Sequence, residues 1–168
     1  MGINNTSSGN YSASIGLGNT SNGSYTFSAN AYNTAHDFCE TVHGRYNVVS
    51  TGSQTSWTST DSLFVIGNGT GTSARSNALQ VLKNANVGIN NSSFNSTAVG
   101  VLSIKNGTAP SAHIDDHIQI YSVDSSDSTA TLGLELEQAV EDIGTFTASH
   151  KIKVKINGTE YWLQLDAV

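Results

Sequence analysis

The sequence predicts an all-β protein built as an elongated stack of short strands, and three observations indicate this. The first fifty residues repeat every fourteen positions, with asparagines in register at Asn5, Asn19, Asn33 and Asn47. Within each copy apolar and small polar residues alternate, which is the two-residue period of a β-strand. Only 12% of the chain is charged, against about 25% in typical domains. Ser, Thr, Asn and Gly take the place of charged residues, which suits short strands joined by tight turns.

A repeat this short indicates stacked coils, because one copy cannot bury an apolar face without its neighbours. Two copies place apolar residues at alternate positions, and we expect these to point inward: Ala13, Ile15 and Leu17, then Phe27, Ala29 and Ala31. The third copy has Thr41, His43 and Arg45 there, which do not suit a dry core. The regular β-roll is therefore predicted to end near residue 50. So few coils bury too little apolar surface to offset their backbone entropy, so we expect other chains to complete the core.

Changes in composition divide the chain into three predicted segments: a β-roll over 1–50, a β stalk segment over 51–95 and a small C-terminal β module over 96–168. In the stalk, strands are predicted over 61–69 and 78–83. In the module, Asn157-Gly158 between two alternating runs predicts a β-hairpin. Residues 134–140 have good helix formers, but the alternation of Leu132, Leu134 and Leu136 favours a strand.

Charge and motifs exclude several function classes. The net charge is −6, and the seven Lys and Arg residues form no run, so a nucleic-acid partner is not expected. No apolar stretch approaches the roughly 20 residues that cross a bilayer as a helix, so no membrane insertion is expected. The motifs of serine nucleophiles, phosphate-binding loops and zinc proteases are absent. We therefore predict a protein that is not an enzyme and needs no cofactor.

Part of the chain resembles known fibrous proteins. The segment from Ala13 to Thr20, with its small and apolar alternation, resembles the left-handed parallel β-roll in the heads of trimeric autotransporter adhesins. Residues 63–89 look like the repeated stalk segments of bacteriophage tail fibres. Residues 104–110 followed by 118–122 are similar to the segment that opens the distal domains of phage fibres. These resemblances imply an elongated, intertwined homotrimer with an N-terminal β-roll and stalk and a small C-terminal β module.

The resemblances also imply a function, for which three alternatives stay open. The first is a structural and adhesive segment of a trimeric phage tail fibre on the virion, which holds or forms a host-receptor-binding surface. Its partners would be its own copies, other virion fibre or baseplate proteins, and a host surface glycan or protein receptor. The second is a bacterial trimeric adhesin or filament subunit at the cell surface or outside the cell. The third is a fragment of a polysaccharide-degrading tailspike.

Two candidate sites follow from particular side chains. On a strand, His113, Asp115 and His117 would share one face, and around a threefold axis they could bind a metal. The alternative is a polar entry to a strand with solvated side chains. Trp162 alternates out of step with Tyr161 and Leu163, so it is predicted to face solvent as a binding residue. The alternative for Trp162 is a place in the core of the module.

Overall fold

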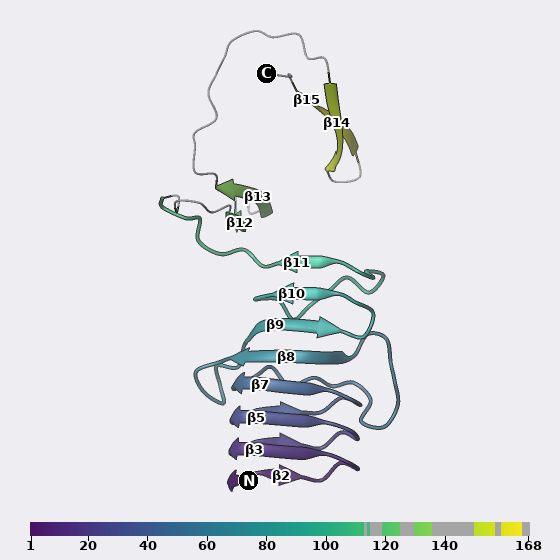
Figure 1. The fold of residues 1–168 in the computed structure, drawn as a ribbon, viewed down its shortest axis with the longest axis vertical. Coiled ribbons are helices and arrows are strands. Elements are labelled where there is room, and N and C mark those ends of the chain that lie inside the picture. Colours follow the sequence, from purple (N-terminus) through teal and green to yellow (C-terminus); the bar gives the residue numbers. More distant parts are fainter. Residues whose placement is uncertain (113, 115–118, 125–129, 136–149, 157–158, 166–168) are drawn as a thin grey trace.

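In the computed structural model, every described element is a β-strand, and the N-terminal two thirds of the chain forms a β-solenoid (Figure 1). The structure describes residues 1–112, 114, 119–124, 130–135, 150–156 and 159–165. The all-β prediction is therefore confirmed for this part of the chain. The solenoid strands are β1 (Gly2–Ile3), β2 (Thr6–Ser7), β3 (Ala13–Leu17), β4 (Thr20–Ser21), β5 (Phe27–Ala31), β6 (Thr34–Ala35), β7 (Thr41–Arg45), β8 (Ser62–Asn68), β9 (Asn77–Leu82), β10 (Val87–Ile89) and β11 (Leu102–Ile104).

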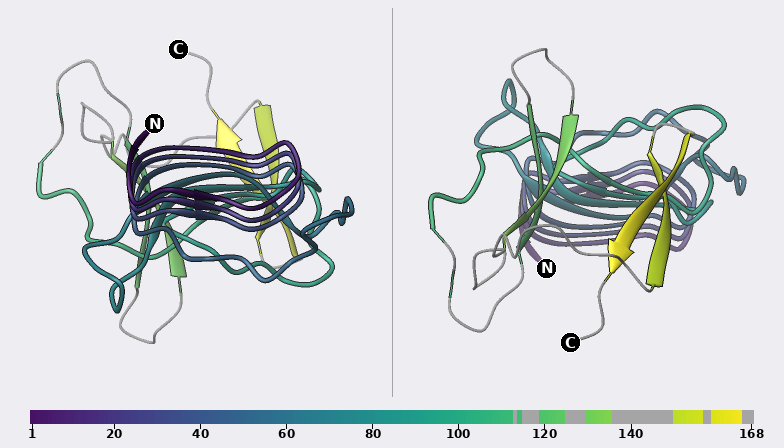
Figure 2. Two further views of the ribbon diagram at one scale, coloured as in Figure 1. Left: turned by 90° about the horizontal axis from the view of Figure 1, so that it is seen from below. Right: turned by 90° about the horizontal axis from the view of Figure 1, so that it is seen from above.

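These strands form two sheets that face each other across a narrow interior. Sheet A has eight strands in the order β1-β3-β5-β7-β8-β9-β10-β11, and sheet B has the three short strands β2-β4-β6. Strands of successive repeats pair in parallel with fourteen-residue register, as in Ser14 with Ser28 and Thr6 with Thr20. Viewed along the stack, the first coils superimpose as one flattened loop (Figure 2). The repeat in the sequence is thus one coil of the solenoid.

The asparagine at the same position of each repeat links each coil to the next. Asn19 Oδ1 accepts the backbone N–H of Asn33 at 2.9 Å, and Asn5 Oδ1 accepts that of Asn19 at 3.0 Å. The amide of Asn33 also donates to the carbonyls of Ala29 and Gly44. Asn19, Asn33 and Asn47 are fully buried. A buried amide with both ends bonded satisfies backbone groups at the corner of each coil, where no strand partner is available.

The interior of the first coils is lined by small polar side chains. Ser14 and Ser28 of sheet A meet Ser21 of sheet B in a hydrogen-bonded cluster, with Oγ–Oγ distances of 2.8 to 3.1 Å. Further along the stack the interior becomes apolar, with Ala35, Val42 and Val65 buried together. These side chains are short because the two sheets of so flat a coil leave little room between them.

The predicted direction of the alternating residues is therefore wrong. Ser14, Ser28 and Val42 point inward, whereas Ile15 and Leu17 are 46% and 37% exposed on the other side of sheet A. The residues that were unsuitable for a core also point outward, since His43 and Arg45 lie on the outer side of β7. Their polarity does not interrupt the roll. Strand β7 pairs in parallel with both β5 and β8, so sheet A continues past residue 50.

Beyond β8 the solenoid changes character. Strand β9 pairs antiparallel with both of its neighbours, β8 and β10, and β11 then adds in parallel to β10. Sheet B ends at β6, so the inner side of β8–β10 is covered by loops instead of strands. Sheet A runs continuously across residues 50 and 95. The division of the chain at these two positions stays a prediction.

Two further strand pairs belong to the predicted C-terminal module. Strand β12 (Gln119–Asp124) pairs antiparallel with β13 (Ala130–Glu135), and β14 (His150–Ile156) pairs antiparallel with β15 (Thr159–Leu165). The register Ile156 with Thr159 is that of the hairpin predicted around Asn157-Gly158. Leu134 lies in strand β13, as its alternation indicates, while residues 136–140 lie outside the described part of the chain.

Candidate functional site

The outer side of sheet A, which we call the outer face, carries mostly apolar side chains, with polar ones at β7. Strand register aligns its residues in columns across the sheet, because each strand presents alternate side chains outward. One column contains, from β3 to β11, Ala13, Phe27, Thr41, Phe64, Val81, Val87 and Leu102. The next contains Ile15, Ala29, His43, Ile66, Leu79, Ile89 and Ile104.

Side chains of the outer face remain exposed in the single chain. Ile3, Leu102 and Ile89 are 66%, 63% and 43% exposed. Thr41 and His43, both on β7, are the polar members at the middle of the face. The His43 ring lies 5.7 Å from that of Phe27 and 5.9 Å from that of Phe64. A contiguous apolar surface of this kind on a monomer marks an interaction site.

Tyrosines form two stacked pairs at other corners of the coils. The ring centres of Tyr11 and Tyr25 are 5.0 Å apart and those of Tyr32 and Tyr46 are 4.8 Å apart, and the two rings of each pair are nearly parallel. All four have a positive φ near +50°. Each ring covers only one face of its partner, and Tyr11 and Tyr25 remain 81% and 54% exposed. The two pairs therefore contribute contacts between successive coils.

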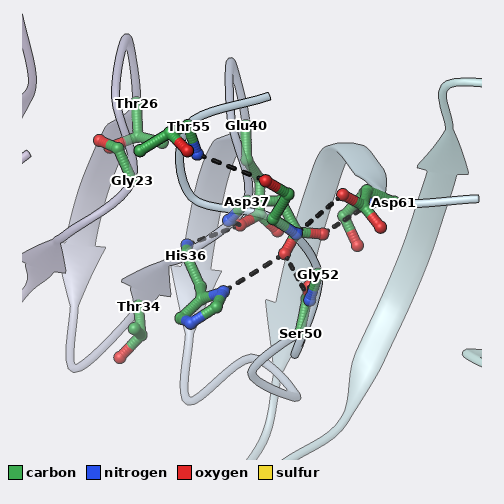
Figure 3. Close-up of polar contacts among 12 residues, drawn as sticks. Gly23, Thr26, Thr34, His36, Asp37, Glu40, Ser50, Gly52, Thr55 and Asp61 are labelled. Atoms are coloured by element: carbon green, nitrogen blue, oxygen red, sulfur yellow. Dashed lines mark hydrogen bonds and ion pairs between the residues drawn. The ribbon is translucent and has the colours of Figure 1, made fainter. Parts of the chain in front are cut away.

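A cluster of carboxylates lies where the third coil meets the loop 50–61 (Figure 3). Asp37 is fully buried; its Oδ2 accepts the backbone N–H of Ser62 at 2.7 Å and its Oδ1 that of Gly52 at 2.9 Å. Asp61 Oδ2 accepts the backbone N–H of Ser53 at 2.9 Å. These bonds attach the loop to the solenoid. The cluster is built by two departures from the repeat, since Asp37 and Glu40 stand where the preceding coil has Gly23 and Thr26.

Glu40 is the buried acid whose protonation this cluster changes. Its Oε2 accepts the backbone N–H groups of His36 and Asp37, while Oε1 has no hydrogen-bond partner. Burial raises the pKa of Glu40 to about 7, although the two backbone hydrogen bonds partly oppose that rise. The nearby charge of Asp37 raises the pKa of Glu40 further, whereas the charge of Lys83 lowers it. At neutral pH this group therefore lies close to its midpoint of titration.

Lys83 provides the cation beside the cluster. Its side chain is buried, with Nζ 3.9 Å from Asp61 Oδ2 and 5.2 Å from the centre of the Trp57 ring. The Phe38 ring lies on another side at 6.0 Å. An ammonium ion held against aromatic faces and a carboxylate is stabilised without direct hydrogen bonds. The arrangement fixes the loop that carries Trp57.

The site residues predicted from the sequence fall in the C-terminal part of the chain. His113, Asp115 and His117 lie outside the described residues, as does the side chain of Trp162, whose backbone pairs with Lys153 in β14–β15. Among the residues that the structure describes, no group of three His, Cys, Asp or Glu side chains is arranged to hold a metal ion. In the same part of the chain no helix is long and apolar enough to span a membrane.

Comparison of the chain with protein-family models, with curated proteins and with solved structures finds no match. The class that the fold defines is a β-solenoid whose interior is polar in the first coils and apolar further along, with a mostly apolar outer face. The outer face and the carboxylate cluster were both missed from the sequence. For the cluster, the replacement of Gly and Thr by Asp37 and Glu40 in the third repeat was the available signal.

Proposed function

We propose that this chain is a structural and adhesive segment of a trimeric fibre of the phage-tail type, which holds or forms a surface that binds a host receptor. The outer face of sheet A carries this proposal. Its mostly apolar columns cover seven strands, and their members Ile15, Ile89 and Leu102 are exposed in the single chain, as expected of a surface that other copies bury.

Three copies suit the geometry of this face. Each solenoid is a straight stack with one flat apolar side, so three stacks placed around a common axis bury all three sides against one another. The segment from Ala13 to Thr20 resembles the heads of trimeric adhesins, and this resemblance also supports three copies. The coils of each chain stay in register, so that a parallel trimer forms a rod.

The interior of the coils supports a mechanical role. Asparagine amides and serine hydroxyls bond successive coils at every step, in addition to the strand ladders. Such a stack distributes load along many hydrogen bonds between neighbouring coils. We therefore expect the solenoid to resist digestion under conditions that cleave ordinary linkers.

Solution mass tests the proposal. Light scattering on the purified chain should give about 53 kDa, three times the 17.6 kDa of one chain. A folded species of 17.6 kDa at micromolar concentration would overturn the trimer, and a mass of twice that value would overturn its threefold arrangement.

The adhesive part requires a separate measurement. Fluorescently labelled trimer should bind bacterial host cells and compete with infecting phage for attachment. Binding only to surfaces other than bacteria would favour a cell-surface adhesin, and release of sugar from host capsule would favour a tailspike enzyme.

A further inference from the structure

The strongest unassigned feature is a polar pocket behind sheet A, at the level where sheet B ends. It has a volume of about 650 Å³ and lies between the inner side of β8 and β9 and the loops 48–52 and 92–96. Small-molecule sites in proteins have volumes of about 300–1,000 Å³. Because the second layer of the solenoid stops at β6, its interior opens here instead of closing on another strand.

One wall of this pocket has a buried hydrogen-bonding group without a partner. Gln80 is only 7% exposed and lines the pocket from β9. Its Nε2 donates to Ser62 Oγ at 2.8 Å, and its Oε1 has no hydrogen-bond partner. A buried carbonyl oxygen left unpaired is costly, and this one is covered by its neighbours. A small turn of the amide toward the pocket would let it accept a hydrogen bond from a ligand.

The charges and the remaining lining restrict the kind of ligand. Asp37 and Asp61 contribute carboxylates to the wall, and neither Lys nor Arg lines it. An anionic ligand would be repelled by these charges. The lining also includes hydroxyl-bearing residues such as Thr60 and Ser92, the aromatic Phe94, and the apolar residues Val48, Val49 and Leu82. A mixture of hydroxyls, amides and one aromatic suits a neutral molecule with many hydroxyl groups.

We infer that this pocket binds a neutral saccharide, with the Gln80 amide turning so that Oε1 accepts a sugar hydroxyl and with Phe94 contacting the ring. This inference rests on the proposed adhesive function and names the receptor class for it. Strand alternation supports the accessibility of the pocket, because Gln80 points inward while its neighbours Leu79 and Val81 point to the outer face. Assembly through the outer face would therefore leave the pocket open.

Saturation-transfer NMR on the full chain tests the inference. The probes are neutral hexoses, N-acetylhexosamines and their disaccharides at millimolar concentration, with sialylated and sulfated sugars as the anionic arm. We expect transfer to neutral sugars and none to the anionic ones. Gln80→Met keeps the shape of the side chain and should weaken binding about tenfold by removing the acceptor. Phe94→Ala should weaken it as well.

Gln54→Met is the matched control, because Gln54 is exposed and does not line the pocket. It should bind as the unsubstituted chain does, and all variants should keep the same solution mass. Absence of transfer to every neutral sugar, a preference for anionic sugars, or full binding by Gln80→Met would overturn the inference. If the trimer still attaches to host cells in those cases, the proposed function stands and only the pocket assignment fails.

Discussion

The side-chain oxygen of Asn77 accepts the backbone N–H of Val48 at a distance of 2.8 Å. Val48 directly follows Asn47, the last asparagine of the fourteen-residue series, so Asn77 continues that ladder from a strand outside the repeat. Asn77 does not stand at the fourteen-residue spacing, yet it accepts a backbone N–H at the corner of the coil as the repeat asparagines do. The ladder therefore follows the position in the fold and not the sequence period. This relationship joins the regular coils to the antiparallel part of sheet A.

Removal of one amide from the ladder should destabilise the solenoid. Asn33→Ala removes two donated hydrogen bonds and the acceptor for Asn47 N–H. At about 1 kcal/mol each, the free energy of unfolding should fall by about 3 kcal/mol. Chemical denaturation at matched protomer concentration measures this loss. Asn10→Ala, at an exposed asparagine, should stay within about 0.5 kcal/mol of the unsubstituted protein. Equal effects of the two substitutions would contradict the ladder.

Gly16 should not accept a side chain. Its φ is +116°, and a Cβ there would lie 2.1 Å from the carbonyl oxygen of Asn30 in the next coil. Gly16→Ala should therefore lower the free energy of unfolding by about 3 kcal/mol, through backbone strain and separation of the coils. Gly100→Ala is the control, because Gly100 also has a positive φ, +64°, but has open space around it. It should cost about 1 kcal/mol. Thermal unfolding of the two variants makes the comparison.

Stability should depend on pH through Glu40. Burial raises the pKa of this carboxyl from 4.5 to about 7, so the folded protein holds the proton more tightly than the unfolded chain does. The stabilisation is full below pH 4.5 and is lost as the pH rises through about 7. At 1.36 kcal/mol per unit of pKa, this difference is about 3 kcal/mol.

Glu40→Gln isolates this contribution from the titration of the histidines. Denaturation curves between pH 5 and 8 should show a smaller decline of stability with pH in the variant than in the unsubstituted protein. The variant should gain most at the alkaline end, where the unsubstituted protein holds a buried charge. Parallel pH profiles for both proteins would show that Glu40 titrates normally.

A charge on the outer face should separate the copies. Ile15 is 46% exposed in the single chain, so Ile15→Asp leaves the fold of one chain intact but places a carboxylate in the proposed interface. The solution mass should fall from about 53 kDa toward the 17.6 kDa of one chain. Thr6→Asp adds the same charge at an exposed position of sheet B and should leave the mass unchanged. Retention of the full mass by Ile15→Asp would place the interface elsewhere.

The carboxylate cluster and the pocket lay beyond sequence reasoning for a physical reason. Asp37, Ser62 and Gly52 meet only because the loop 50–61 folds back on the third coil. Gln80 reads in the sequence as the polar member of an alternating strand. Its unpaired oxygen depends on how the loops 48–52 and 92–96 surround it, and no local pattern specifies that arrangement.

The sequence by itself determined the period, the strands and the coil. The fourteen-residue spacing of asparagine and the strict alternation indicate β-strands stacked in successive coils, because both patterns act through local geometry and hydrogen bonding. Only the tertiary structure decided which side of each strand faces inward. Alternation is the same for either choice, and hydrophobicity favoured Ile15 and Leu17. The narrow space between sheets A and B admits Ser14, Ser28 and Val42 but not larger side chains, so available volume decided the direction.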